Sequence, residues 1–299
     1  MLEVWFLYAL TSAIFFGFTT IVDKLMLEKR LSSFSYFVSF VPPALVFSVY
    51  VLLSSARNVF SFPYAIAFVA GLLSAGGYFL YVVTIRREEA SRIAALTSLA
   101  PAFVAVLALF LVDETFSAKP YTGIILMILG SVLISYKRTH VKKIIPFSLV
   151  LILVAINFFY SLDQTFSKIS LDQIAFLPFL MMFMFGRFAL AFPGLAIHSV
   201  RTKFVSQVKK LGRNFTLALV FGSIMWSLAI ILFFYAASLG PITLVSTTGL
   251  ISPLFTLFFA ILITKYLPEV LEEEIDKKTV ALKLVAIVLI FLGTYLIIS

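Results

Sequence analysis

The chain has 299 residues, of which 62% are hydrophobic and 12% charged, with a formal net charge of +9. Soluble domains are nearer half apolar and a quarter charged, so a water-soluble fold of this length could not hide so much apolar surface. The absence of cysteine excludes disulfides and cysteine–metal sites, and two histidines are too few for a histidine metal cluster.

Ten apolar segments approach the ~20 residues that a helix needs to cross a bilayer. They cover residues 4–22, 34–53, 63–85, 92–112, 120–136, 145–166, 174–198, 214–238, 241–264 and 279–298. Backbone polar groups in lipid must be satisfied within a segment, and no alternating strand pattern of a β-barrel is present. The sequence therefore predicts an all-α integral membrane protein with ten transmembrane helices and the lipid bilayer as a partner.

An internal repeat divides these segments into two groups of five. The pattern of residues 78–111 recurs at 230–263, where Pro253 follows Pro101 by 152 positions, and a glycine-centred helix end follows in each case at Gly130 and Gly293. We predict a first five-helix repeat at 1–136, a linker at 137–146 and a second repeat at 147–299. Because five is odd, the second repeat must start from the opposite side of the membrane, which predicts two inverted five-helix repeats.

The basic residues lie mostly in one set of short loops. The loops after the first, third, fifth, seventh and ninth segments carry 18 Lys and Arg residues, and the other loops carry 3. This distribution reads as membrane orientation and not as nucleic-acid binding, so no nucleic-acid partner is expected. The positive-inside rule predicts a multi-pass protein of the cell membrane with both termini outside.

Two connections, 199–212 and 267–278, have apolar residues on one helical face. Each fits either a helix lying on an anionic leaflet or a solvated linker.

Arg187 is the clearest candidate for function. An ionisable side chain at bilayer depth costs at least ~2.5 kcal/mol, so it is a functional candidate by default. Arg187 lies midway along its apolar segment, and Gly186 beside it would let another helix approach. The alternative is an arginine that only locks helices together.

The segment 145–166 carries a polar stripe. Asn157, Ser161, Gln164 and Lys168 share one helical face, which must look toward protein or water. Asn157 lies deeper and is the better site candidate, with Gln164 beside it. Asp163 and Lys168 are expected to be interface residues near the helix end.

Aromatic and hydroxyl side chains complete the predicted site. Buried polar tips of aromatic residues need partners, and a proline that removes a backbone hydrogen bond exposes a carbonyl at mid-membrane. The candidates are Tyr78, Tyr81, Trp226 and Tyr235, with Thr97 before Pro101 and Thr247 before Pro253. For any single hydroxyl, helix packing is the favoured alternative. Glu114 and Glu269 each close a proline-containing segment and are expected to cap or anchor it.

These features resemble the EamA-like family of the drug/metabolite transporter superfamily. The resemblance is carried by the helix-closing and helix-breaking positions Pro101, Glu114, Gly123, Gly130, Pro253, Glu269 and Gly293, by Lys24, Lys168 and Arg187, and by the links 90–96 and 239–242. It implies a ten-helix secondary carrier with a central cavity, often exporting amino acids or related metabolites. Family members are described with cytoplasmic termini, whereas the charges place the termini outside. The chain also departs from the family pattern in two ways. The first repeat has Pro42–Pro43 where its equivalent in the second repeat has Arg187, and the segment 4–22 has no glutamate within the membrane.

Together the residues predict a secondary active transporter of small polar or amphipathic metabolites, amino-acid-like compounds foremost, working by alternating access. The substrate would bind Arg187, Asn157, Gln164, Thr97, Thr247 and the aromatic candidates. Neither an enzyme nor a cofactor is expected, because motifs such as HExxH, GxSxG and the P-loop are missing. A nucleotide-sugar or sugar-phosphate carrier and a non-transporting membrane scaffold are the alternatives. A coupling proton, the direction of transport and the oligomeric state stay open.

Overall fold

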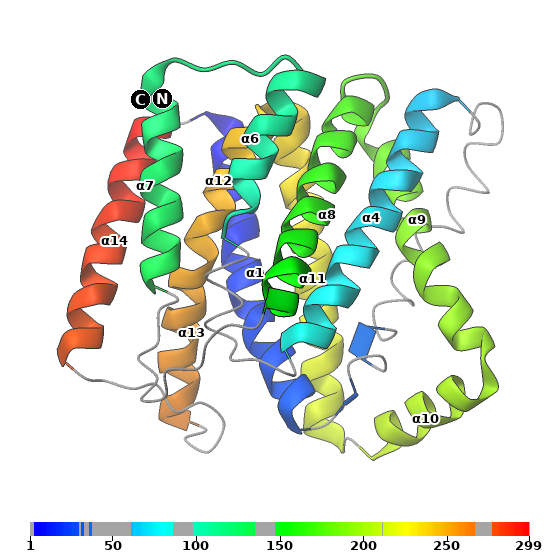
Figure 1. Cartoon of the computed structure of the whole chain (residues 1–299). Coiled ribbons are helices and arrows are strands. Elements are labelled where there is room, and N and C mark those ends of the chain that lie inside the picture. Colours follow the sequence, from blue (N-terminus) through cyan, green and yellow to red (C-terminus); the bar gives the residue numbers. More distant parts are fainter. Residues whose placement is uncertain are drawn as a thin grey trace.

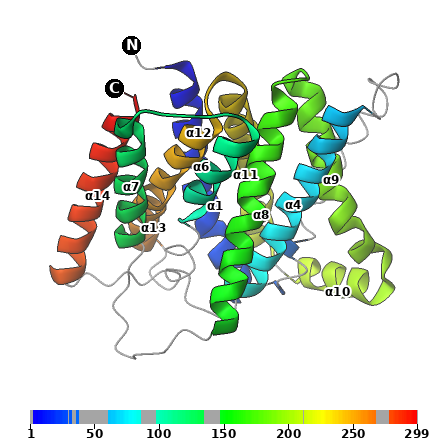
Figure 2. The same ribbon diagram turned by 45° about the horizontal axis from the view of Figure 1, so that its top comes forward.

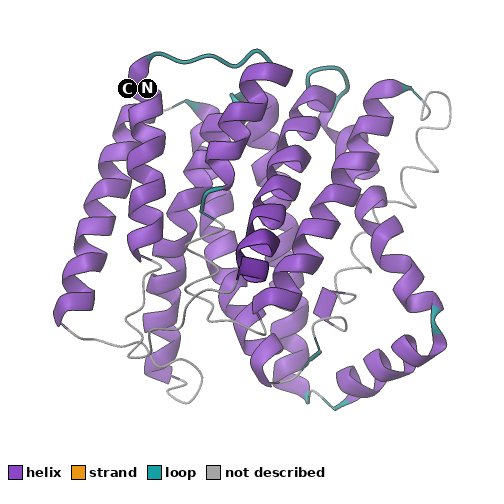
Figure 3. Cartoon of the chain, in the orientation of Figure 1, coloured by secondary structure: helices purple, strands orange, loops and turns teal. Residues whose placement is uncertain are grey.

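The computed structural model describes residues 3–29, 31–32, 36–37, 61–85, 98–134, 147–210, 212–266 and 277–298. Within these ranges every regular element is a helix and none is a strand, which confirms the predicted all-α class (Figure 3). Of the predicted segment 34–53, only residues 36 and 37 are described, and the linker 137–146 and the connection 267–276 lie outside the described residues.

The helices follow the predicted segments closely. They are α1 (Val4–Lys29), α4 (Phe62–Ile85), α6 (Ala100–Leu111), α7 (Ala118–Ile134), α8 (Phe147–Leu171), α9 (Phe176–Ala196), α10 (His198–Lys209), α11 (Arg213–Leu239), α12 (Ile242–Thr248), the 3-10 helix η1 (Gly249–Ile251), α13 (Ser252–Tyr266) and α14 (Lys277–Ile298).

Seven of the described helical stretches are long and apolar enough to cross a membrane, and α6 and α7 are shorter apolar helices. Large apolar side chains on their outer surfaces stay uncovered, for example Phe110 at 75% and Phe291 at 65% exposure. A contiguous apolar exterior of this kind is unfavourable in water and favourable in lipid. The protein is therefore a multi-pass membrane protein.

Both ends of the chain lie at the same end of the helix bundle (Figure 1). We call this end the terminal face; α6, α8 and α11 end there, and α7, α9 and α12 begin there. The amphipathic helix α10 lies across the opposite face, where Phe204 and Val208 pack against the core while Lys203 and Lys209 are exposed. Of the two alternatives for 199–212, the structure shows the amphipathic helix.

The helix at 241–264 is broken, as the proline in it predicts. Pro253 has no backbone N–H to continue the hydrogen-bond ladder of an α-helix. The chain passes from α12 into η1 and then into α13, and the break lies directly before Pro253. On the first half of the chain, α6 likewise begins with Pro101 in its first turn.

Two predicted helix ends are wrong in a way that affects the site. The first helix was expected to end at residue 22 and continues to Lys29, because Leu25, Met26 and Leu27 extend its apolar run. The helix expected to end at residue 166 continues to Leu171. In both cases a charged residue expected at a helix end lies inside the helix.

The helices form one bundle, shown in two views (Figures 1 and 2). The closest neighbours are α7 with α14, α1 with α11, and α4 with α8 and α9, while α1 also packs on α13, and α6 on α8. Gly123 and Gly293 make the α7–α14 crossing tight, since a Cβ on either would lie 2.8 or 2.7 Å from the carbonyl oxygen of the other.

Candidate functional site

A crossing of α4 and α9 at two glycines sets the position of the site. A Cβ on Gly71 would lie 2.0 Å from the Phe183 carbonyl oxygen, and a Cβ on Gly186 would lie 2.1 Å from the Phe68 carbonyl oxygen. Only glycine permits backbones this close. The predicted role of Gly186 is confirmed, and the contact brings the next residue of α9, Arg187, to the face of α4.

Arg187 is buried between α9 and its neighbouring helices. Its side chain is 7% exposed, and its Nη1 donates a hydrogen bond to the Ser74 hydroxyl of α4. Its guanidinium carbon lies 4.4 Å from the ring centroid of Trp226 in α11 and 5.9 Å from that of Tyr78. A desolvated cation over an aromatic face gains about 2 kcal/mol. Two helices, α4 from the first half of the chain and α11 from the second, thus hold this cation of α9.

Asp163 of α8 is the acidic neighbour of Arg187. It is 4% exposed, and its carboxyl group interacts with the Ser74 side chain and with the charge of Arg187. Its Oδ1 has no hydrogen-bond partner among the described residues. The prediction that Asp163 is an interface residue is wrong, because α8 runs eight residues further to Leu171, about 12 Å at the rise of a helix.

A second buried carboxylate comes from α1. Asp23 is 6% exposed and accepts a hydrogen bond from the Tyr36 hydroxyl. Tyr36 is followed by Phe37, whose ring centroid lies 6.3 Å from that of Tyr78, so Asp23 lies beside the same polar cluster. Sequence reasoning missed Asp23 by placing it at the end of the first helix. The apolar residues 25–27 after it were the signal that it lies within the span.

Aromatic rings form one side of this cluster. Tyr78 and Tyr81 stack with centroids 6.1 Å apart, and Tyr78 lies 6.1 Å from Trp226 and 6.3 Å from Phe37. Gly77 lets α8 approach, since a Cβ there would be 3.2 Å from the Tyr160 ring. Three of the predicted site residues, Tyr78, Tyr81 and Trp226, are thus brought together with Arg187.

The remaining predicted residues lie elsewhere or turn to their own helix. Asn157 is buried and donates from Nδ2 to the Leu153 carbonyl oxygen at 2.8 Å. Thr247 is buried and donates to the Thr243 carbonyl oxygen at 2.7 Å, which fits the packing alternative. Gln164 is half-buried, and its Oε1 has no partner among the described residues. Thr97 lies outside the described residues.

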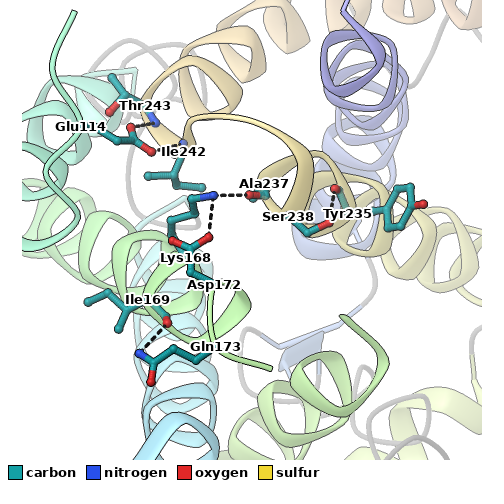
Figure 4. A network of polar contacts seen from close by, with 10 residues as sticks. All are labelled: Glu114, Lys168, Ile169, Asp172, Gln173, Tyr235, Ala237, Ser238, Ile242 and Thr243. Atoms are coloured by element: carbon teal, nitrogen blue, oxygen red, sulfur yellow. Dashed lines mark hydrogen bonds and ion pairs between the residues drawn. The ribbon is translucent and has the colours of Figure 1, made fainter. Parts of the chain in front are cut away.

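Tyr235 is not brought to the cluster. It is 36% exposed, and its ring makes edge contacts with Tyr8 at 4.8 Å and Phe176 at 5.2 Å. In Figure 4 it points away from the polar contacts of the terminal face. The placement of Tyr235 near Arg187 is therefore wrong; the residue is nine positions beyond Trp226, at the end of α11.

The link between α11 and α12 is held at the terminal face by both halves of the chain (Figure 4). Glu114 accepts hydrogen bonds from the backbone N–H groups of Ile242, at 2.7 Å, and Thr243, at 3.1 Å. Lys168 donates to the Ala237 carbonyl oxygen at 3.1 Å and pairs with Asp172 at 2.9 Å. The carboxylate caps the start of α12 and the ammonium group the end of α11. Glu114 was expected to cap the proline-containing segment that it closes, and it instead caps α12 in the other half of the chain. Glu269 lies outside the described residues.

The chain is an all-helical membrane protein that buries ionisable side chains among its helices. Residues 3–136 match the model of the EamA-like transporter family, a family of the drug/metabolite transporter superfamily. The family is one of membrane transporters, which confirms the resemblance seen in the sequence.

Solved structures agree on the fold. In the comparison with solved structures, 27 chains match this one. One of them, described as "Crystal structure of protein", is 12% identical, covers 99% of this chain and 96% of its own, and has a TM-score of 0.73. At that identity the likeness shows the fold alone. No curated protein matches the chain.

Proposed function

We propose that the protein is a secondary active transporter of small polar or amphipathic metabolites, with amino-acid-like compounds as the substrate class. The observation that carries this proposal is the buried guanidinium of Arg187 at mid-membrane, held by Ser74 and Trp226. Keeping a charge there costs several kcal/mol, and a carrier regains that cost when the charge binds an ionic substrate.

The helix packing supports two inverted repeats. If α1, α4, α6 and α7 correspond to α8, α11, α13 and α14, exchanging the halves turns the α1–α11 contact into the α8–α4 contact. The same exchange turns α1–α13 into α8–α6 and leaves α7–α14 unchanged, and each of these contacts is present. α1 begins at the terminal face and its counterpart α8 ends there (Figure 1), which supports opposite orientations of the two halves. Such internal symmetry is typical of carriers whose halves rock about a central site.

The contacts at the terminal face support alternating access. Glu114 and Lys168 hold the α11–α12 link from the two halves, and the Trp5 ring packs on Gly240 in that link, where a Cβ would lie 2.5 Å from Trp5 Cγ. We infer that this face is closed in the structure and that transport requires these contacts to separate. By the charge count, the terminal face is the outer face of the cell membrane.

The charge of the cluster distinguishes the rival carriers. A sugar-phosphate or nucleotide-sugar brings an anion of two charges or more, which needs several basic groups at that depth. The described cluster has one guanidinium, of Arg187, and two carboxylates, of Asp23 and Asp163. It therefore favours a substrate with little or no net charge over a phosphate ester.

Uptake into proteoliposomes tests the proposal. Purified protein should accumulate at least one member of a radiolabelled panel of amino acids above protein-free liposomes. Arg187→Ala should abolish that uptake, and Tyr235→Phe, on the outer side of α11, should preserve it. Absence of flux for the whole panel, with intact folded protein, would favour a non-transporting scaffold.

A further inference from the structure

Asp163 has an incomplete set of partners in the middle of the site. The Asp163 side chain is 4% exposed, and its Oδ1 lacks a hydrogen bond among the described residues. An unsatisfied buried carboxylate oxygen costs several kcal/mol, and such groups in native structures need an explanation. The other buried acid of the cluster differs, because the Asp23 carboxylate already accepts a hydrogen bond from Tyr36.

The guanidinium of Arg187 does not provide the missing hydrogen bond to Asp163. Arg187 donates to Ser74, the Asp163 carboxyl group interacts with the same serine, and no ion pair within 4.0 Å joins the two charges in the described part of the chain. Two successive hydrogen bonds through one hydroxyl span about 5–6 Å. The site therefore holds a guanidinium and a carboxyl group side by side, both in contact with Ser74, without a direct ion pair between them.

We propose that Asp163 binds the ammonium group of a zwitterionic substrate whose carboxylate binds Arg187. A head group whose ammonium and carboxylate groups are bonded to one carbon would satisfy both side chains at once, and it adds no net charge to the bilayer interior. The rings of Tyr78, Tyr81 and Trp226 beside it suit an apolar or aromatic side chain. This inference rests on the proposed transporter function and specifies its substrate as an α-amino acid with an apolar side chain.

Three ligands that differ only in charge test the assignment. L-Phenylalanine carries both groups, 3-phenylpropionate lacks the ammonium group, and phenethylamine lacks the carboxylate. Binding to the purified full chain is measured by titration calorimetry. Wild type should bind phenylalanine at least about tenfold more tightly than either analogue, as expected for the loss of one charged hydrogen bond.

Asp163→Asn should lose the preference for phenylalanine over 3-phenylpropionate. Arg187→Gln should instead lose the preference over phenethylamine. Asp163→Glu, which keeps the carboxylate, should retain part of the first preference. Asp113→Asn is the matched control: Asp113 is exposed at a backbone φ of 55°, a conformation that asparagine adopts readily, so the preferences should not change.

The outcomes separate this inference from the proposed function. Wild-type protein that binds phenylalanine and 3-phenylpropionate equally would overturn the role of Asp163 and leave a carrier standing. A folded Asp163→Asn protein with wild-type preferences would overturn it as well. Wild-type protein that binds none of the three ligands would overturn the inference, and transport of another panel member would still preserve the carrier.

Discussion

Gly186→Ala should drive α4 and α9 apart at the point where the site is assembled. The new Cβ would lie 2.1 Å from the Phe68 carbonyl oxygen, about 1.3 Å short of the 3.4 Å at which ordinary contact begins. The obstacle is backbone on a facing helix, so a side-chain rotation cannot relieve it. Either the helices separate by about that distance or the helix bends, and the contact between Arg187 and Ser74 is lost.

The expected cost is at the upper end of overpacking, about 3 kcal/mol. For a chain of this size that corresponds to a fall of the thermal midpoint by about 6 °C, on the scale of about 2 °C per kcal/mol. Thermal unfolding of the detergent-purified protein measures it. Gly249→Ala is the control, because a Cβ there meets nothing within 4 Å, and its midpoint should stay level or rise slightly. An unchanged midpoint and unchanged uptake for Gly186→Ala would refute the close crossing as the basis of the site.

Two further predictions concern the closure of the terminal face and the aromatic side of the cluster. Glu114→Gln removes the charge and one of the two acceptors that cap α12, a loss of about 1.4 kcal/mol, so deuterium exchange at the Ile242 amide should accelerate about tenfold. Exchange equal to wild type, or an equal effect of Asp113→Asn, would argue against the cap. Trp226→Leu removes the cation–π contact of about 2 kcal/mol and should raise the KM for uptake more than tenfold, whereas Tyr235→Phe should leave it unchanged; equal effects of both would place the site elsewhere.

The sequence predicted the parts of this fold that depend on local pattern. Length and hydropathy predicted the described spanning helices. Pro253 predicted the break between α12 and α13, and Gly186, next to Arg187, predicted a close helix approach. These succeed because the bilayer demands continuous apolar helices and because proline and glycine act on their own backbone.

The composition of the site was less predictable, because it depends on where helices end and cross. Ending the sixth helix at residue 166 placed Asp163 at the membrane surface, and ending the first at residue 22 did the same for Asp23. Helical periodicity put Asn157 on a polar face and Tyr235 was selected for its polar tip, but neither feature identifies the helix that packs against the residue. The Gly71–Gly186 contact, which selects Ser74 as the neighbour of Arg187, joins residues 115 positions apart, and a single sequence does not pair them.

Counterflow measures the central claim, exchange of substrate through a site that opens to one side at a time. Proteoliposomes are loaded with an unlabelled mixture of amino acids, and the entry of a dilute labelled mixture is followed. A carrier predicts transient accumulation of label above the outside concentration, absent from Arg187→Ala vesicles. Label that only equilibrates with the outside, at the rate seen in protein-free vesicles, would contradict the account.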